Sequence, residues 1–282
     1  MITPFLAHAA PAASAALIAV CLGLVAASAS GYMLLAGGVP GPSLGSRHLL
    51  ATGAGFAATV IAFSPVVESA AESAFAPHMV QHLLLVSAAA PLFALGRTGS
   101  MLVASLGARR TPRAVRAVRA VVHRAAAGGR AIMAATGVSV LTLWLWHAPP
   151  LYEAATADAT VHGLEHVTLF VSALWFWVAI LRRRSATHVA LAALLVGAIA
   201  HSLLGGLITF APRPLYPSYV TAGLADQQLA GVLMWVPGGL VHLAAGVVLV
   251  FTLFEATARR TDLRETARRP VLAGTATDQG AS

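Results

Sequence analysis

Charged residues and cysteine are both scarce in this chain. Of its 282 residues only 10% are charged and 58% are hydrophobic, and lysine is absent, so all 18 basic residues are arginines. This composition excludes an ordinary soluble domain and is typical of a membrane protein. The single cysteine, Cys21, excludes an intrachain disulfide and a metal site built from paired cysteines.

Signals for nucleotide and protease chemistry are missing as well. Without lysine there is no Gly-x-x-x-x-Gly-Lys-Ser/Thr phosphate loop. The segment His162-Gly-Leu-Glu165-His166 differs from the zinc-protease motif, in which glutamate directly follows the first histidine. The net charge of +8 comes from arginines in loops between apolar segments, which set membrane topology and do not indicate nucleic-acid binding. We therefore expect neither an enzyme nor a nucleic-acid-binding protein.

Long apolar segments dominate the chain. A bilayer core of about 30 Å is crossed by a helix of roughly 20 residues. Segments of suitable length lie at 12–36, 49–67, 79–96, 130–148, 164–181, 187–210 and 229–254. The sequence predicts an all-α polytopic bundle of about seven transmembrane helices within residues 1–258, followed by a polar, disordered tail at 259–282. We expect Pro91 to bend the third span and Pro237-Gly238-Gly239 to kink or break the seventh.

The arginines are distributed unevenly between the loops. Seventeen of the 18 fall in alternate connections and the tail, and only Arg213 falls on the opposite side. The positive-inside rule therefore predicts an outer N-terminus and a cytoplasmic C-terminus. Between Arg110 and Arg119 an arginine recurs every third residue, which indicates a basic amphipathic helix at about 105–127. Anionic lipid is its expected partner, and a docking site for a protein is the alternative.

Histidine is sorted to the side opposite arginine. Eight of the 11 histidines lie on the predicted outer side, and His8 alone among them precedes every predicted span. Imidazole is the commonest metal ligand among side chains, so this distribution suggests a metal or haem site. The candidate ligands are His78, His82, His147, His162, His166, His201 and His242.

Four of these candidates form two pairs with helical spacing. His78 and His82 are four residues apart, as are His162 and His166, so each pair shares one helix face. Such a pair can bind one ion, or its members can bind separate centres; zinc and Cu(II) accept imidazole, and Cu(I) also accepts thioether. The alternatives are interfacial histidines at helix ends and, for the two deepest histidines, hydrogen bonds between helices.

Further polar and sulfur-containing residues lie near these histidines. Glu165, directly before His166, suits a supporting role beside the metal ligands better than direct ligation, because adjacent helical residues point about 100° apart. Asp226 and Gln227 precede the seventh span, where we expect either support for the site or a helix cap. Met79 and Met234 place thioethers nearby.

Four stretches in order along the chain carry a family resemblance. They are HMVQHLLLVSAAAPLFALG from His78, LWLWHAPPLYEAA from Leu143, HGLEHVTLFVSALWFW from His162 and DQQLAGVLMWVPGG from Asp226. In these stretches the chain resembles the CtaG-type assembly factors of caa(3)-type cytochrome c oxidases, which are polytopic proteins of the bacterial inner membrane. The matching residues are His78, His82, His147, His162, His166, Asp226, Gln227 and Met234.

The resemblance implies a function and partners. It implies a role in maturing a haem–copper oxidase, with oxidase subunits as partners and with copper held or delivered on the outer side. His201 and His242 are added to the site from their depth alone. Three alternatives remain open: a haem-binding electron carrier, a structural scaffold without metal, and a transporter or proton channel, for which we find no inverted repeat.

Overall fold

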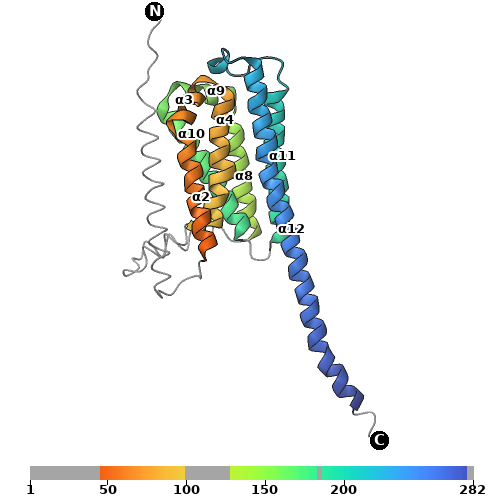
Figure 1. Ribbon diagram of the computed structural model, residues 1–282. Coiled ribbons are helices and arrows are strands. Elements are labelled where there is room, and N and C mark those ends of the chain that lie inside the picture. The colour runs from red at the N-terminus through yellow and green to blue at the C-terminus, as the bar shows by residue number, and fades with distance from the viewer. Residues whose placement is uncertain (1–44, 99–127, 183–185, 278–282) are drawn as a thin grey trace, which may run out of the picture.

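The computed structural model describes residues 45–98, 128–182 and 186–277, and helices are the only regular secondary structure in this part of the chain (Figure 1). The elements in chain order are α2 (Ser46–Ala62), α3 (Pro65–Ser73), α4 (Phe75–Leu83), the π-helical turn η1 (Leu84–Ala89), α5 (Ala90–Leu95), α8 (Gly129–Trp146), α9 (Pro149–Ala157), α10 (Ala159–Leu181), α11 (Thr187–Thr209), the 3₁₀ turn η2 (Pro217–Tyr219) and α12 (Gly223–Thr277). The predicted all-α class is confirmed.

Most of these helices are suited to cross a membrane. Five qualify by length and hydropathy: Phe75–Leu95, Gly129–Trp146, Ala159–Leu181, Thr187–Thr209 and Gly223–Arg259. The pair α2 and α3, bent by 48°, adds a sixth if it counts as one broken span. They correspond to the second to seventh predicted spans. The first predicted span and the basic segment 105–127 lie outside the described residues, and the orientation stays a prediction from the arginines.

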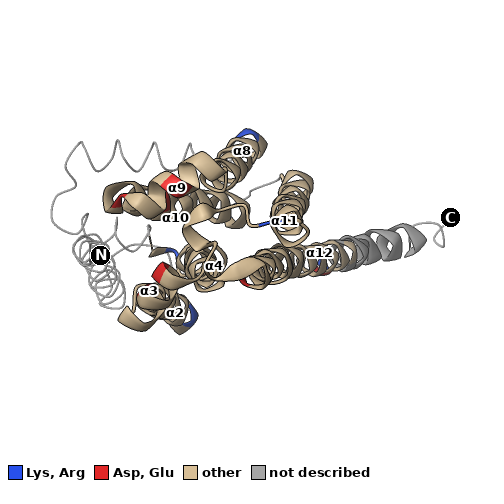
Figure 2. Cartoon of the chain, turned by 90° about the horizontal axis from the view of Figure 1, so that it is seen from above, with Lys and Arg blue, Asp and Glu red and all other residues tan. Residues whose placement is uncertain are grey.

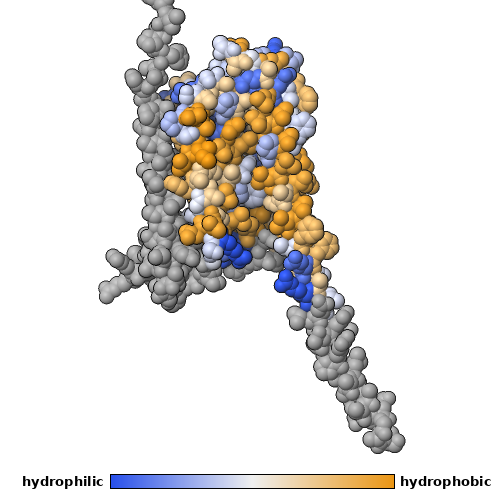
Figure 3. Space-filling view, viewed as in Figure 1, coloured by the Kyte–Doolittle hydropathy of each residue, from blue (hydrophilic) through white to orange (hydrophobic). Residues whose placement is uncertain are grey.

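The surface of the bundle is apolar where lipid would cover it. Large side chains such as Leu141, Leu195, Leu207 and Phe251 are 60–65% exposed. In Figure 3 hydrophobic residues cover the middle of the visible face, and hydrophilic residues gather towards both ends. Lipid tails offer no hydrogen-bond partners, so polar side chains are not favoured on a surface that faces them. The backbone N–H and C=O groups must therefore be hydrogen-bonded within the helices.

The run α4–η1–α5 forms the centre of the bundle. Seen from above, α4 is surrounded by α2, α10 and α12 (Figure 2). The most apolar window of Phe75–Leu95 is 67% buried, against 28% for Gly129–Trp146 and 22% for Gly223–Arg259. Polar side chains on α4 are therefore enclosed by protein rather than by lipid, which is the position expected of intramembrane residues with a function.

The helices α11 and α12 approach each other closely through glycine. A Cβ atom on Gly205 would lie 2.6 Å from the carbonyl oxygen of Gly231, and one on Gly197 would lie 2.6 Å from the ring of His242. A Cβ atom on Gly238 would lie 3.0 Å from the ring of His201. Small residues let helix backbones pack closely in lipid. Here they also leave room for two buried imidazoles between the helices.

Proline has different effects in the third span, which contains Pro91, and in the seventh span, which contains Pro237. The third span stays helical, but it widens into the π-helical turn at Leu84–Ala89 directly before α5, which contains Pro91. Proline has no N–H group to donate to the carbonyl oxygen four residues earlier in the helix. A π-helical turn changes the local number of residues per helical turn. The seventh span is not broken at Pro237, since α12 continues through this residue and is packed along α11. A kink at this position stays a prediction.

The C-terminal segment 259–282 was predicted to be disordered, and this stays a prediction. In the structure residues 259–277 continue α12 as a helix that projects away from the bundle (Figure 1). Alanine, arginine, leucine and glutamate in this segment are strong helix formers, so a helix already started in the membrane is readily extended.

Candidate metal-binding site

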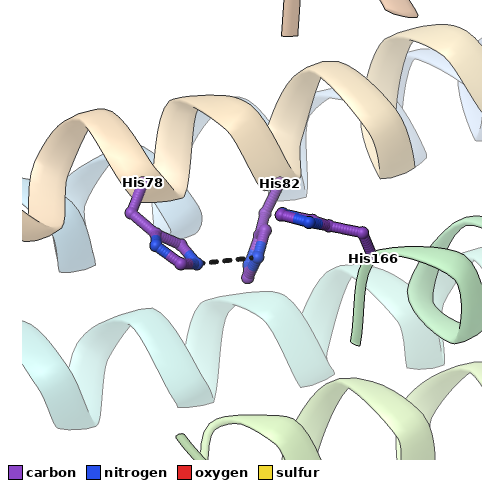
Figure 4. Close-up of side chains that lie close together, drawn as sticks. All are labelled: His78, His82 and His166. Atoms are coloured by element: carbon purple, nitrogen blue, oxygen red, sulfur yellow. Dashed lines mark hydrogen bonds between the residues drawn. The ribbon is translucent and has the colours of Figure 1, made fainter. Parts of the chain in front are cut away.

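Four histidines and one glutamate form a buried cluster between α4 and α10. His78 and His82 project from α4, and His162, Glu165 and His166 project from α10. Figure 4 shows His78 and His82 one turn apart on the same helix, with His166 reaching toward them from another. The exposed fractions of His78, His82 and His166 are 2%, 5% and 3%, and Glu165 is fully buried. Only His162 is partly accessible.

The cluster contains two overlapping groups of ligand atoms. One consists of His78, His82 and His166, and the other of His78, His162 and Glu165. Within each group, one ligand atom per residue lies within 4.8 Å of the others. Two nitrogens bound tetrahedrally to one ion at about 2.0–2.1 Å would be about 3.3 Å apart. The Nε2 atoms of His78 and His82 are 3.0 Å apart, so ligation needs a shift of only tenths of an ångström.

Hydrogen bonds define which nitrogen of His78 faces its neighbours. The Tyr219 hydroxyl donates to the carbonyl oxygen of Ala71 at 2.8 Å, so its oxygen accepts from Nδ1–H of His78 at 3.1 Å. Nε2 of His78 then carries the lone pair and accepts from Nε2–H of His82. A hydrogen-bonded Nδ1 that presents Nε2 is the usual arrangement of a metal-binding histidine.

Glu165 lies opposite the α4 histidines. Its Oε1 is 3.7 Å from Nε2 of His82, and its Oε2 is 4.0 Å from Nε2 of His78. Neither oxygen has a hydrogen-bond partner among the described residues. The sequence predicted a supporting role for Glu165, and this stays a prediction. In the structure Glu165 also falls in one of the two ligand groups. An ionised carboxylate buried without a partner is costly, so a cation at this position would remove a penalty.

His147 adds a further free nitrogen next to the cluster. It follows the end of α8, and its ring centroid is 5.9 Å from that of His82. Nδ1 donates to the carbonyl oxygen of Leu143 at 2.7 Å, and Nε2 is buried with no hydrogen-bond partner among the described residues. Because Nδ1–H is engaged by this carbonyl oxygen, Nε2 carries the lone pair of the neutral ring and is available as a ligand.

The two deepest histidines form a separate pair. His201 on α11 and His242 on α12 have ring centroids 4.8 Å apart. Their Nδ1 atoms donate to the carbonyl oxygens of Gly197 and Gly238, both at 2.9 Å. Neither belongs to the two ligand groups of the outer cluster. The predicted set of seven histidines is thus brought into one part of the bundle, but it is divided into an outer cluster and an inner pair, with His147 close to the outer cluster.

Asp226 and Gln227 support the site without touching the histidines. Asp226 accepts hydrogen bonds from the backbone N–H groups of Phe75 and Ala76, so it caps α4, whose own preceding residue offers no side-chain cap. Gln227 accepts from the N–H of Leu215 at 2.6 Å and holds the connection between α11 and α12. Of the two predicted roles, Asp226 acts as a cap, although the helix it caps is α4 rather than its own.

Tyrosine side chains that pack against the cluster were not predicted from the sequence. Tyr152 from α9 and Tyr219 from η2 contact the His78 ring, with centroids 5.4 and 6.2 Å away. Tyr216 stacks near Tyr152 and donates from its hydroxyl to the carbonyl oxygen of His147 at 2.8 Å. Burial raises the pKa of Tyr152 above its ordinary value, so it stays neutral. Tyr152 lies in the second resembling stretch, but no spacing in the sequence connects it to His78.

Fold and site together define a class: a polytopic helical membrane protein with a buried histidine–glutamate cluster between its helices. The family model described as cytochrome c oxidase caa3 assembly factor (Caa3_CtaG) matches residues 31–256. The chain belongs to this family, and the predicted resemblance is confirmed. No curated protein and no solved structure gives a significant match. The protein is therefore a multi-pass membrane member of a family of cytochrome c oxidase assembly factors.

Proposed function

We propose that this protein binds copper in the outer histidine cluster and delivers it to a cytochrome c oxidase during assembly. The observation that carries the proposal is the pair of overlapping ligand groups that share His78. One of them contains Glu165, whose buried carboxylate has no hydrogen-bond partner among the described residues. Copper is the cargo in this proposal, and the oxidase subunit that receives it is the partner. The role needs no turnover chemistry from the chain itself.

The donor set favours a transition metal over the common hard cations. Magnesium and calcium prefer oxygen ligands, whereas four imidazoles with one carboxylate suit copper or zinc. Copper binds such sites more strongly than zinc in the general order of divalent affinities. The family role in assembling a cytochrome c oxidase supports copper as the cargo.

A transfer site must release its ion as well as bind it. His78 belongs to both ligand groups, so an ion can change partners one at a time without losing all of its ligands. His162, the partly accessible member, provides the approach from the end of the bundle that carries α3 and α9. With the predicted orientation this end faces the outer side of a bacterial inner membrane.

Copper retention by purified protein tests the proposal. The full chain with His82→Ala and His166→Ala is compared with wild type by elemental analysis after purification in detergent and loading with Cu(II). We expect the double variant to lose bound Cu(II) while keeping its helical content. His188→Ala is the control, because this histidine is exposed at the beginning of α11. Unchanged copper in the double variant would refute the assignment.

Two rival functions give different results. If the protein were a haem-binding electron carrier, the absorption spectrum of the purified protein would show a Soret band. The close packing of the outer rings, with two Nε2 atoms 3.0 Å apart, argues against a porphyrin between them. A structural scaffold without metal predicts that the double variant still supports full oxidase activity in cells. Loss of oxidase copper in those cells, with normal levels of the assembly factor, is the result that the copper proposal requires.

A further inference from the structure

A second set of possible ligands surrounds a small cavity on the inner side of the cluster. The cavity has a volume of about 10 Å³, room for roughly one water molecule or ion. Met79, His82, His147, His201 and Met234 are among its lining residues. They come from α4, α11, α12 and the end of α8, so segments far apart in sequence meet here. Met79 and Met234 are only 0% and 3% exposed.

We propose that this cavity is a second metal site, selective for Cu(I), with the thioethers of Met79 and Met234 and the imidazoles of His147 and His201 as its ligands. The inference rests on the proposed function, because it takes copper as the cargo. It adds a site that is distinct from the outer cluster in position and in ligand chemistry. Its consequence is that the protein holds copper in two stages.

The imidazoles at the cavity are prepared for ligation. Nε2 of His147 is buried at the cavity and has no hydrogen-bond partner among the described residues. Its Nδ1 is engaged by the carbonyl oxygen of Leu143, and Nδ1 of His201 is engaged by that of Gly197. These bonds set both rings in the tautomer that leaves Nε2 with a lone pair. A bound ion would satisfy the unpartnered nitrogen of His147.

The sulfur atoms give the cavity its selectivity. Thioether is a soft, polarizable ligand that suits Cu(I) and contributes little to binding zinc or magnesium. The proposed ligands are all neutral, whereas the outer cluster contains the carboxylate of Glu165. Burying an ion is less costly for one charge than for two when no ligand is charged. The inner cavity therefore favours a monovalent ion.

His82 connects the two sites. It belongs to the outer group with His78 and His166, and it also lines the inner cavity. An ion can pass inward by exchanging one ligand for another at His82. Imidazole binds copper, so Cu(I) can occupy the outer cluster as well as the cavity. The exchange then takes place in one oxidation state and needs no electron donor or acceptor.

The experiment loads the full-length, detergent-purified protein with Cu(I) under anaerobic conditions and records X-ray absorption. We expect sulfur scattering in the wild type, which contains only Cys21 and six methionines as sulfur residues. The variant Met79→Leu with Met234→Leu, which nearly conserves volume, should lose the sulfur scattering and bind Cu(I) at least tenfold more weakly. The control Met133→Leu, at a position 68% exposed on α8, should behave as wild type.

The outcomes separate this inference from the proposed function. Copper bound with nitrogen and oxygen scattering only, and with equal affinity in wild type and the double methionine variant, overturns the inner site but leaves the outer cluster in place. Absence of copper from the wild type overturns both. The wild-type spectrum decides the question even if the double variant fails to fold. Retention of Cu(II) by the methionine variant, at the wild-type level, is expected because the outer histidines remain.

Discussion

The carboxylate of Asp226 accepts a hydrogen bond from the backbone N–H of Phe75 at 2.7 Å, across 151 positions of sequence. The first residue of α4 is thereby attached to the first turn of α12. Because α4 carries His78 and His82, this contact sets the depth and rotation of half the outer cluster. Asp226 therefore matters to the site although it does not touch the histidines.

Removing the cap should destabilise the protein and loosen the site. For Asp226→Ala we expect a loss of about 1 kcal/mol in the free energy of unfolding, typical of a lost N-cap, and weaker copper binding. Thermal unfolding and copper titration measure the two effects. Asp226→Asn keeps a capping oxygen, so its stability and its copper affinity should lie between those of Asp226→Ala and wild type. Equal copper affinity in all three proteins would contradict a positioning role.

Replacing Glu165 by glutamine should weaken copper binding without lowering the stability of the metal-free protein. Glu165→Gln conserves size but removes the only acidic group of the outer cluster. We expect copper affinity to fall by at least tenfold. The metal-free protein should be as stable as wild type or more stable, because an unpaired buried carboxylate is costly. Glu153→Gln, which alters a contact to exposed Ser218, is the matched control. Unchanged affinity in Glu165→Gln would exclude Glu165 as a ligand.

The glycine contact between α11 and α12 gives a prediction about packing. Gly205→Ala places a Cβ atom 2.6 Å from the carbonyl oxygen of Gly231. Overpacking of this kind costs about 1–3 kcal/mol, so thermal unfolding should occur at a clearly lower temperature. The adjacent Gly206→Ala has no atom within 4 Å of its Cβ and should be neutral or slightly stabilising. Equal effects of the two substitutions would contradict the close helix contact.

The cap of α10 predicts a pH dependence. Backbone N–H groups of Val161 and Thr160 donate to Asp158 and lower the pKa of its carboxyl group. A lowered folded-state pKa means that the contribution to stability is present above the unfolded value of about 4 and is lost as the pH falls through the folded-state pKa. Wild type and Asp158→Asn, compared by thermal unfolding, should differ by an amount that changes only below about pH 4. A difference that is constant across this range would contradict the assignment.

The spans and the helix faces were largely predictable from sequence. Apolar length alone predicted the third to seventh spans, because a bilayer imposes a minimum length on every helix that crosses it. The four-residue spacing of His78 and His82 placed both rings on one face, since helix geometry is local. Side-chain direction across an interface is not local, so the sequence could not show that Glu165 lies opposite His78 and His82.

The sequence by itself determined the all-α membrane class and the residue types available for metal binding, because hydropathy and helical period depend on near neighbours along the chain. Only the tertiary structure decided which helices face each other. It brought α4 against α10, placed the cover of Tyr152 and Tyr219 over His78, and closed a cavity between Met79 and Met234. These contacts join residues about 70 to 155 positions apart, and they depend on how small residues and caps let whole helices pack.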